Sequence, residues 1–167
     1  MGKFGAAWGL TGILLLIGSA VYRLTVRAFE AFSSPFQWYH WAALAFIVVS
    51  MAYMEGYRAF QKGFSPRVAA RARYLKNHPD ALHALLAPFF CMAYFHAPRR
   101  RKITSVSVTA GIIVLVMLVR LLPQPWRGII DGGVVVGLTW GLVSLLIFSM
   151  QAFTSPEFGY PPEVPEA

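Results

Sequence analysis

The feature that most constrains this chain is a set of long apolar segments, each about as long as a lipid bilayer is thick. These segments cover residues 4–26, 38–57, 103–122 and 129–153. A helix rises 1.5 Å per residue, so about 20 residues cross the roughly 30 Å hydrocarbon layer. Charged residues make up only 13% of the chain, about half their share in soluble domains. The sequence therefore predicts an all-α integral membrane protein with four transmembrane helices.

A polar region, residues 58–102, separates the second and third predicted spans and is rich in basic residues. The Ser-Pro pair at 65–66 is a typical helix start, with Ser as N-cap and Pro at the first helical position. Val68, Ala72 and Leu75 then share one narrow apolar stripe at helical spacing. We therefore expect an amphipathic helix lying on the anionic inner leaflet, with its basic side chains around that stripe.

Residues 81–97 form a short apolar segment whose placement is ambiguous. A helix of this length measures about 25 Å, the lower limit for a span. Basic clusters precede it and follow it, and the positive-inside rule assigns both to the cytoplasm. A straight span would leave one cluster outside. We therefore expect a short re-entrant or interfacial helix kinked at Pro88, with a fifth span as the alternative.

The distribution of Lys and Arg gives the orientation. With the N-terminus inside, the cytoplasm holds Lys3, six basic residues within 58–76 and four within 99–102, against four outside. This bias accounts for the net charge of +8 without a nucleic-acid partner. We expect a bacterial inner-membrane protein with both termini cytoplasmic, a single transmembrane domain over residues 1–153, and a Pro/Glu-rich extended tail over 154–167. The four outside residues are Arg23, Arg27, Arg120 and Arg127.

The most specific local pattern is a ladder of glycines in the fourth span, at Gly133, Gly137 and Gly141. Glycines four apart lie on one helix face and let a second backbone approach closely. A shorter pair, Gly5 and Gly9, occurs in the first span, so these two helices are candidates to pack together. We interpret the ladder as packing within the bundle, with a homodimer face as the alternative.

Glu55 lies where the second span meets the cytoplasm. An acid at a membrane edge is costly unless it is paired or hydrated, which makes it a candidate functional group. Arg58 follows three residues later, within ion-pair reach on an α-helix. We interpret the pair mainly as an anchor for the helix end.

Other candidate groups lie in the polar region. His78 and His83, with Glu55, are candidate catalytic groups of an interfacial enzyme. Asp80, His83 and His96 are candidate metal ligands if the segment folds back on itself.

Several site classes are disfavoured by what the sequence lacks. His40 lies at the opposite end of the second span from the other histidines, so a bis-histidine haem is not expected. The chain has no HExxH, Walker or CxxC motif, and we predict no cofactor. Cys91 is the single cysteine and lies in an apolar run, where it acts as a small hydrophobe.

The sequence favours a non-catalytic accessory, assembly or scaffold subunit that presents a basic inner-leaflet face to membrane lipids or to a membrane-protein partner, with a homo-oligomer as a further option. The alternatives are an interfacial enzyme acting on a lipid-like substrate and, less favoured because the spans lack deep charges, a channel or carrier. The candidate lipid or partner contacts are Arg58, Arg67, Arg71, Arg73, Lys76, Arg99, Arg100, Arg101 and Lys102.

Overall fold

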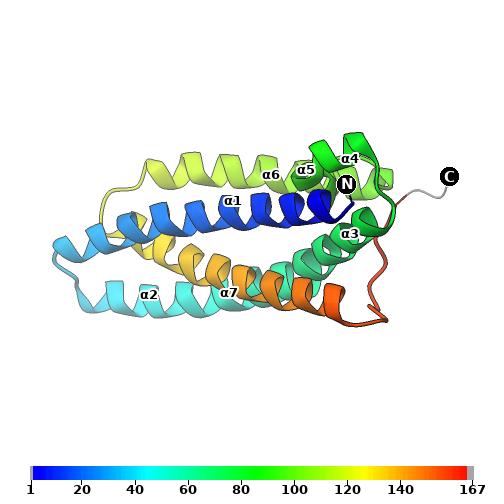
Figure 1. Cartoon of the computed structure of the whole chain (residues 1–167). Helices are drawn as coiled ribbons and strands as arrows, with labels where there is room; N and C mark the ends of the chain where they lie inside the picture. The colour runs from blue at the N-terminus through cyan, green and yellow to red at the C-terminus, as the bar shows by residue number, and fades with distance from the viewer. Residues whose placement is uncertain (1, 165–167) are drawn as a thin grey trace.

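The computed structural model describes residues 2–164, and within this range the chain is built from helices and connecting segments without a strand. Three helices are long and apolar enough to cross a membrane. They are α1 (Gly2–Glu30, continued by the 3-10 turn η1, Ala31–Ser33), α6 (Arg99–Arg120) and α7 (Trp126–Thr154). All three extend along the long axis of the molecule (Figure 1). The all-helical class predicted from the sequence is confirmed.

A second long helical run begins with α2 (Trp38–Met51), continues as η2 (Ala52–Phe64) and ends as α3 (Ser65–Asn77). Two hydrogen bonds close its first turn: the Gln37 N–H donates to His40 Nδ1 at 3.1 Å, and the His40 N–H donates to the Gln37 carbonyl at 3.0 Å. η2 is a π-helix, whose i→i+5 bonds widen the turn. The segment 38–57 is therefore an α-helix followed by a π-helix.

The glycine face of α7 receives α2 and η2. A Cβ on Gly137 would lie 2.6 Å from the Glu55 carboxylate, and a Cβ on Gly141 would lie 2.6 Å from the Phe60 ring. A Cβ on Gly133, the first glycine of the ladder, would lie 2.5 Å from the Ile47 side chain. Side chains at these positions would push the helices apart, which is why small residues suit such an interface. The three glycines are Gly133, Gly137 and Gly141.

The glycines of α1 serve a different contact from the one expected. Gly5 and Gly9 lie against Ala84 and Ala87, not against α7. α1 and α7 do pack together, but they meet where Gly128 approaches the opposite end of α1 and η1. The reason is geometric, because the start of α1 is occupied by the segment that follows α3.

That segment forms two five-residue helices, α4 (Ala81–Leu85) and α5 (Ala87–Cys91). The prediction of one helix kinked at Pro88 is wrong in detail, since the break lies at Leu86. Proline has no N–H and its ring collides with the carbonyl four residues earlier, so the preceding helix ends and a new one begins with Pro88 in its first turn.

α3 is inserted into the bundle, where it packs against α1 and α7. Val68, Ala72 and Leu75 are at most 1% exposed, so the predicted apolar stripe is confirmed. Eight of the thirteen residues of α3 are buried, so the helix packs inside the bundle over a wider face than the narrow stripe that the sequence predicted. This stripe belongs to the main hydrophobic core, which also contains Ile13 and Ile17 of α1, Phe90 of α5 and Leu145 of α7.

α6 stands apart from this core. None of its apolar window is buried, and Val108 and Ile112 are each 55% exposed. Its first half is tied to the preceding loop by Ser105, whose hydroxyl donates to the Met92 carbonyl at 2.9 Å, and by a bond between Thr109 and Tyr94.

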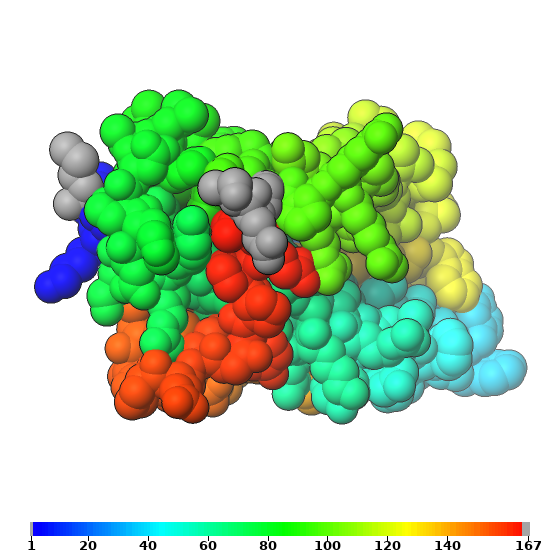
Figure 2. Space-filling view, turned by 90° about the vertical axis from the view of Figure 1, so that its right-hand side faces the viewer, coloured from blue at the N-terminus to red at the C-terminus, as the bar shows by residue number. Residues whose placement is uncertain are grey.

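The chain leaves α7 at Thr154 and returns as an extended tail across the end of the bundle. In Figure 2 the tail, in red, lies between the green α3–α4 region and the yellow-green beginning of α6. Its last residues, 165–167, lie outside the described range.

Candidate functional site at the basic end

Arg71 organises the end of the bundle that carries most of the basic residues. It lies on the same helical stripe as Val68 and Leu75, three residues after the first and four before the second, so α3 points it into the core. The residue is only 2% exposed. The Nε donates to the Phe90 carbonyl at 2.7 Å, and the guanidinium lies 4.2 Å from the centre of the Phe90 ring. The expectation that Arg71 contacts lipid is therefore wrong.

The remaining donors of Arg71 join two segments that are distant in sequence. Nη2 donates to the carbonyls of Phe95 and His96 at 3.1 and 2.9 Å. Nη1 donates to the carbonyls of Pro162 and Glu163 at 3.1 and 3.3 Å. Burial lowers the pKa of Arg71 to about 10, which leaves it charged near neutral pH. One cation thus holds the loop after α5 and the tail against α3.

Two further arginines fix the tail. Arg73 donates to the Ser155 carbonyl at 3.0 Å and to the Pro156 carbonyl. Arg101, in the first turn of α6, pairs with both carboxylate oxygens of Glu163, at 2.7 Å from Nη2 and 2.5 Å from Nε. A two-point pair of this kind fixes direction as well as distance. The tail therefore joins α3 to α6.

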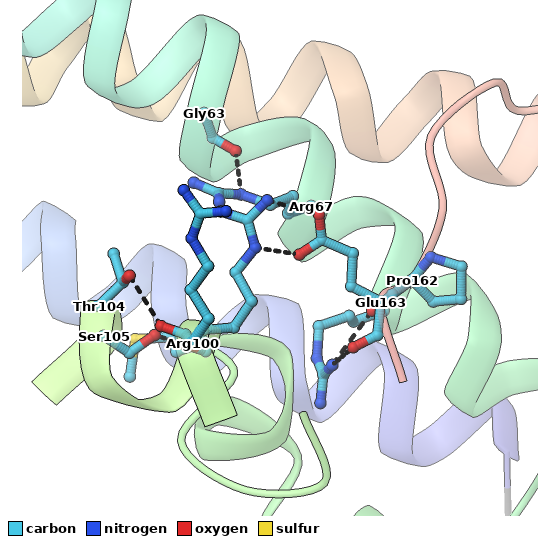
Figure 3. Close-up of polar contacts among 10 residues, drawn as sticks. Gly63, Arg67, Arg100, Thr104, Ser105, Pro162 and Glu163 are labelled. Carbon is cyan, nitrogen blue, oxygen red and sulfur yellow. Dashed lines mark hydrogen bonds and ion pairs between the residues drawn. The ribbon is translucent and has the colours of Figure 1, made fainter. Parts of the chain in front are cut away.

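A cleft of about 350 Å³ opens beside this pair. Arg67 projects into it from the first turn of α3, with its Nε donating to the Gly63 carbonyl at 2.6 Å. Figure 3 shows the side chain of Arg100 rising from α6 toward Arg67, with Glu163 facing the same space. Partial burial lowers the pKa of Arg67, and the nearby charge of Arg101 adds to the effect. The lining residues are Lys62, Gly63, Pro66, Arg67, Arg101, Tyr160, Pro161 and Glu163.

Glu55 does not pair with Arg58 as expected. Within residues 2–164 no ion pair joins them, and Arg58 is exposed. Both residues belong to the π-helix η2, whose wider turn takes a residue three positions later off the shared face. The Glu55 carboxylate instead lies against Gly137 of α7.

The histidines of the polar region form a local cluster. His83 Nδ1 lies 3.0 Å from the Asp80 carboxylate, and its ring centre lies 4.7 Å from that of His96. Asp80 also caps α4 by accepting the His83 backbone N–H at 3.2 Å. His78 is directed elsewhere, with its ring stacked on Tyr74.

This cluster does not form the predicted metal site. Among the described residues no three His, Cys, Asp or Glu side chains are arranged to hold a metal ion. His83 instead pairs its Nδ1 with Asp80 and packs its ring on Phe90 and Phe95. The candidate catalytic groups also do not converge. Glu55 of η2 packs against α7, whereas α4, which carries His83, packs on α1 and α5.

The other predicted basic contacts divide into bound and exposed side chains. Arg67, Arg73 and Arg101 take part in the contacts above, and Lys76 lies 5.3 Å from the Phe153 ring. The exposed ones are Arg58, Arg99, Arg100 and Lys102.

The tail residues of this site were not anticipated from the sequence. Glu163 and the carbonyls of Ser155, Pro156 and Pro162 belong to no motif. The position of Arg71 was open to prediction, because its helical spacing with the apolar stripe of α3 places it on the buried face. No family model matches the chain, and no curated protein or solved structure matches it either.

Proposed function

We propose that this chain is a small accessory protein of the bacterial inner membrane, without catalytic activity, whose basic cytoplasmic end binds anionic lipid headgroups. The observation that carries this proposal is the gathering of cationic side chains from η2, α3 and α6 around one carboxylate, that of Glu163. Near-surface Lys and Arg each contribute about 1 kcal/mol to attraction toward an anionic leaflet.

Four spans are part of this proposal. α2 and η2 together run from Trp38 to Phe64 along α7, a length sufficient to cross the hydrocarbon layer. Trp38, Tyr39 and Trp41 at the start are exposed, as expected for aromatic side chains at a lipid–water boundary. Both termini are then cytoplasmic, on the same side as the basic end.

A re-entrant path for α4 and α5 is also part of it. Gly5, Gly9 and Gly12 of α1 meet Ala84, Ala87 and Pro88 in succession, so the two short helices follow α1 away from its start. The loop after α5 then returns to Arg99. Such a path needs its backbone buried in protein, which agrees with the burial of Ala87, Phe90 and Cys91.

The experiment is thermal unfolding of the purified chain in mild detergent with added phosphatidylglycerol or phosphatidylcholine. The proposal predicts a higher Tm with the anionic lipid only. Replacing the exposed Arg99, Arg100 and Lys102 together by Gln should reduce that rise, because their charges contribute to the attraction. An equal response to both lipids would contradict the proposal.

A further inference from the structure

The cleft at the basic end has the chemistry of a phosphate site. Lys62, Arg67 and Arg101 line it, and Glu163 is the one acidic lining residue among residues 2–164. Its volume of about 350 Å³ is at the lower end for small-molecule sites. Because the Nε of Arg67 is bonded to the Gly63 carbonyl, the guanidinium is oriented before any ligand arrives. Planar guanidinium groups match the oxygens of phosphate in two-point contacts.

The cleft holds more cationic side chains than the single carboxylate of Glu163 can pair with. Glu163 gives both of its oxygens to Arg101. Among residues 2–164, no acidic side chain forms an ion pair with Arg67 or Lys62. Like charges held together raise the energy of the site unless an anion lies between them.

The position of the cleft favours a phosphate attached to a lipid over a soluble one. Lys62 lies near the end of η2 and Arg101 lies in the first turn of α6, so the cleft is at the level where long apolar helices begin. On the same side of α6, Val108 and Ile112 follow Arg101 by seven and eleven residues, the helical repeat of one face. Both are 55% exposed, which leaves apolar surface beside the cleft for acyl chains.

We propose that this cleft binds the phosphate group of one anionic lipid, that Lys62, Arg67 and Arg101 donate to its oxygens, and that the Glu163 carboxylate competes with it. The inference rests on the proposed function, to which it adds a single site with defined residues. The tail then lowers the affinity of the site through Glu163, whereas a diffuse basic surface has no such competitor.

The test is calorimetric titration of the full chain in dodecyl maltoside with three probes: dihexanoylphosphatidylglycerol, dihexanoylphosphatidylcholine and inorganic phosphate. We expect saturable binding of the phosphatidylglycerol at one per chain and at least tenfold weaker binding of the other two. Arg67→Gln should weaken phosphatidylglycerol binding at least tenfold, equivalent to about 1.4 kcal/mol. Arg99→Gln is the matched comparison, because Arg99 is exposed on the basic face but does not line the cleft. It should weaken binding by no more than about fivefold, the contribution of one near-surface charge.

Glu163→Gln provides the second variant, with an effect of opposite sign. Removing the competing carboxylate should tighten phosphatidylglycerol binding by about threefold or more, a result that loss of folding cannot produce. A fall in affinity for this variant would show that the Glu163 carboxylate does not compete with the lipid phosphate. Equal losses for Arg67→Gln and Arg99→Gln would overturn the site while leaving the basic-face function intact. If inorganic phosphate binds as tightly as phosphatidylglycerol, the conclusion that the ligand is a lipid is wrong. If both lipids bind equally tightly, the proposed function is wrong as well.

Discussion

Replacing Arg71 by Met should loosen the whole basic end of the molecule. The guanidinium holds five backbone carbonyls from two segments of the chain. Methionine keeps much of the length and the apolar stem but donates no hydrogen bond. The Phe90 carbonyl is buried, whereas the other four lie in part-buried surroundings that water can reach.

The size of the effect follows from these surroundings. A buried acceptor left without a partner costs about 1–3 kcal/mol, and each hydrogen bond from a charged donor contributes about 1.5–3 kcal/mol. Removing the guanidinium also removes its own desolvation cost, which offsets part of this loss. Because the variant leaves carbonyls unpaired but no uncompensated charge, we expect a net destabilisation of about 3 kcal/mol.

The single cysteine is a built-in reporter of this change. Cys91 directly follows Phe90 and is 1% exposed. Labelling by a maleimide therefore requires α5 to open. Because each 1.4 kcal/mol is a factor of ten, a loss of about 3 kcal/mol should raise the labelling rate about 100-fold.

The rate should be measured in detergent and normalised to the chain unfolded in SDS. Arg58→Met is the matched control, since Arg58 is exposed, and its labelling rate should stay within about threefold of the parent. An Arg71→Met rate equally close to the parent would refute the assigned role of Arg71.

The remaining predictions concern packing and pH. Gly128→Ala should destabilise the chain by about 1–3 kcal/mol because the new methyl overlaps Ala31. Gly111→Ala on the open α6 should stabilise the chain by about 0.5–1 kcal/mol. Equal changes in Tm for the two variants would contradict the close packing of Gly128 against Ala31. Burial lowers the pKa of His96, with smaller contributions from the charges of His83 and Arg71. The unfolded chain then binds this proton more readily, so stability should be complete above about pH 6.5 and fall as pH drops through the unfolded and then the folded pKa. His96→Gln should flatten that acid limb of the Tm profile, and an unchanged profile would exclude this cause.

The long helices were predictable because their signals are local. The lengths of the apolar segments and the stripe of Val68, Ala72 and Leu75 follow from the spacing of residues along one helix. The glycines of α7 likewise identify a face for close packing. The identity of the partner was not predictable, because spacing does not say which helix lies opposite.

The π-helix and the site at the basic end depend on contacts between distant segments. η2 adopts its wide turn where Glu55 and Phe60 meet the glycine face of α7, and no sequence signal for that register was found. The carbonyls that surround Arg71 come from residues 90–96 and 162–163. Carbonyls carry no sequence signature, so a buried arginine satisfied by them resembles a surface one in sequence.

The most direct test of the proposed topology is the side of the membrane on which the two ends of residues 78–102 lie. In a Cys91→Ala background, His78→Cys and Lys102→Cys should both react with an impermeant maleimide from the cytoplasmic side, and Ser33→Cys only from the opposite side. That result is predicted by four spans with α4 and α5 dipping into the bilayer. Labelling of His78→Cys and Lys102→Cys from opposite sides would contradict it and make residues 81–97 a fifth span.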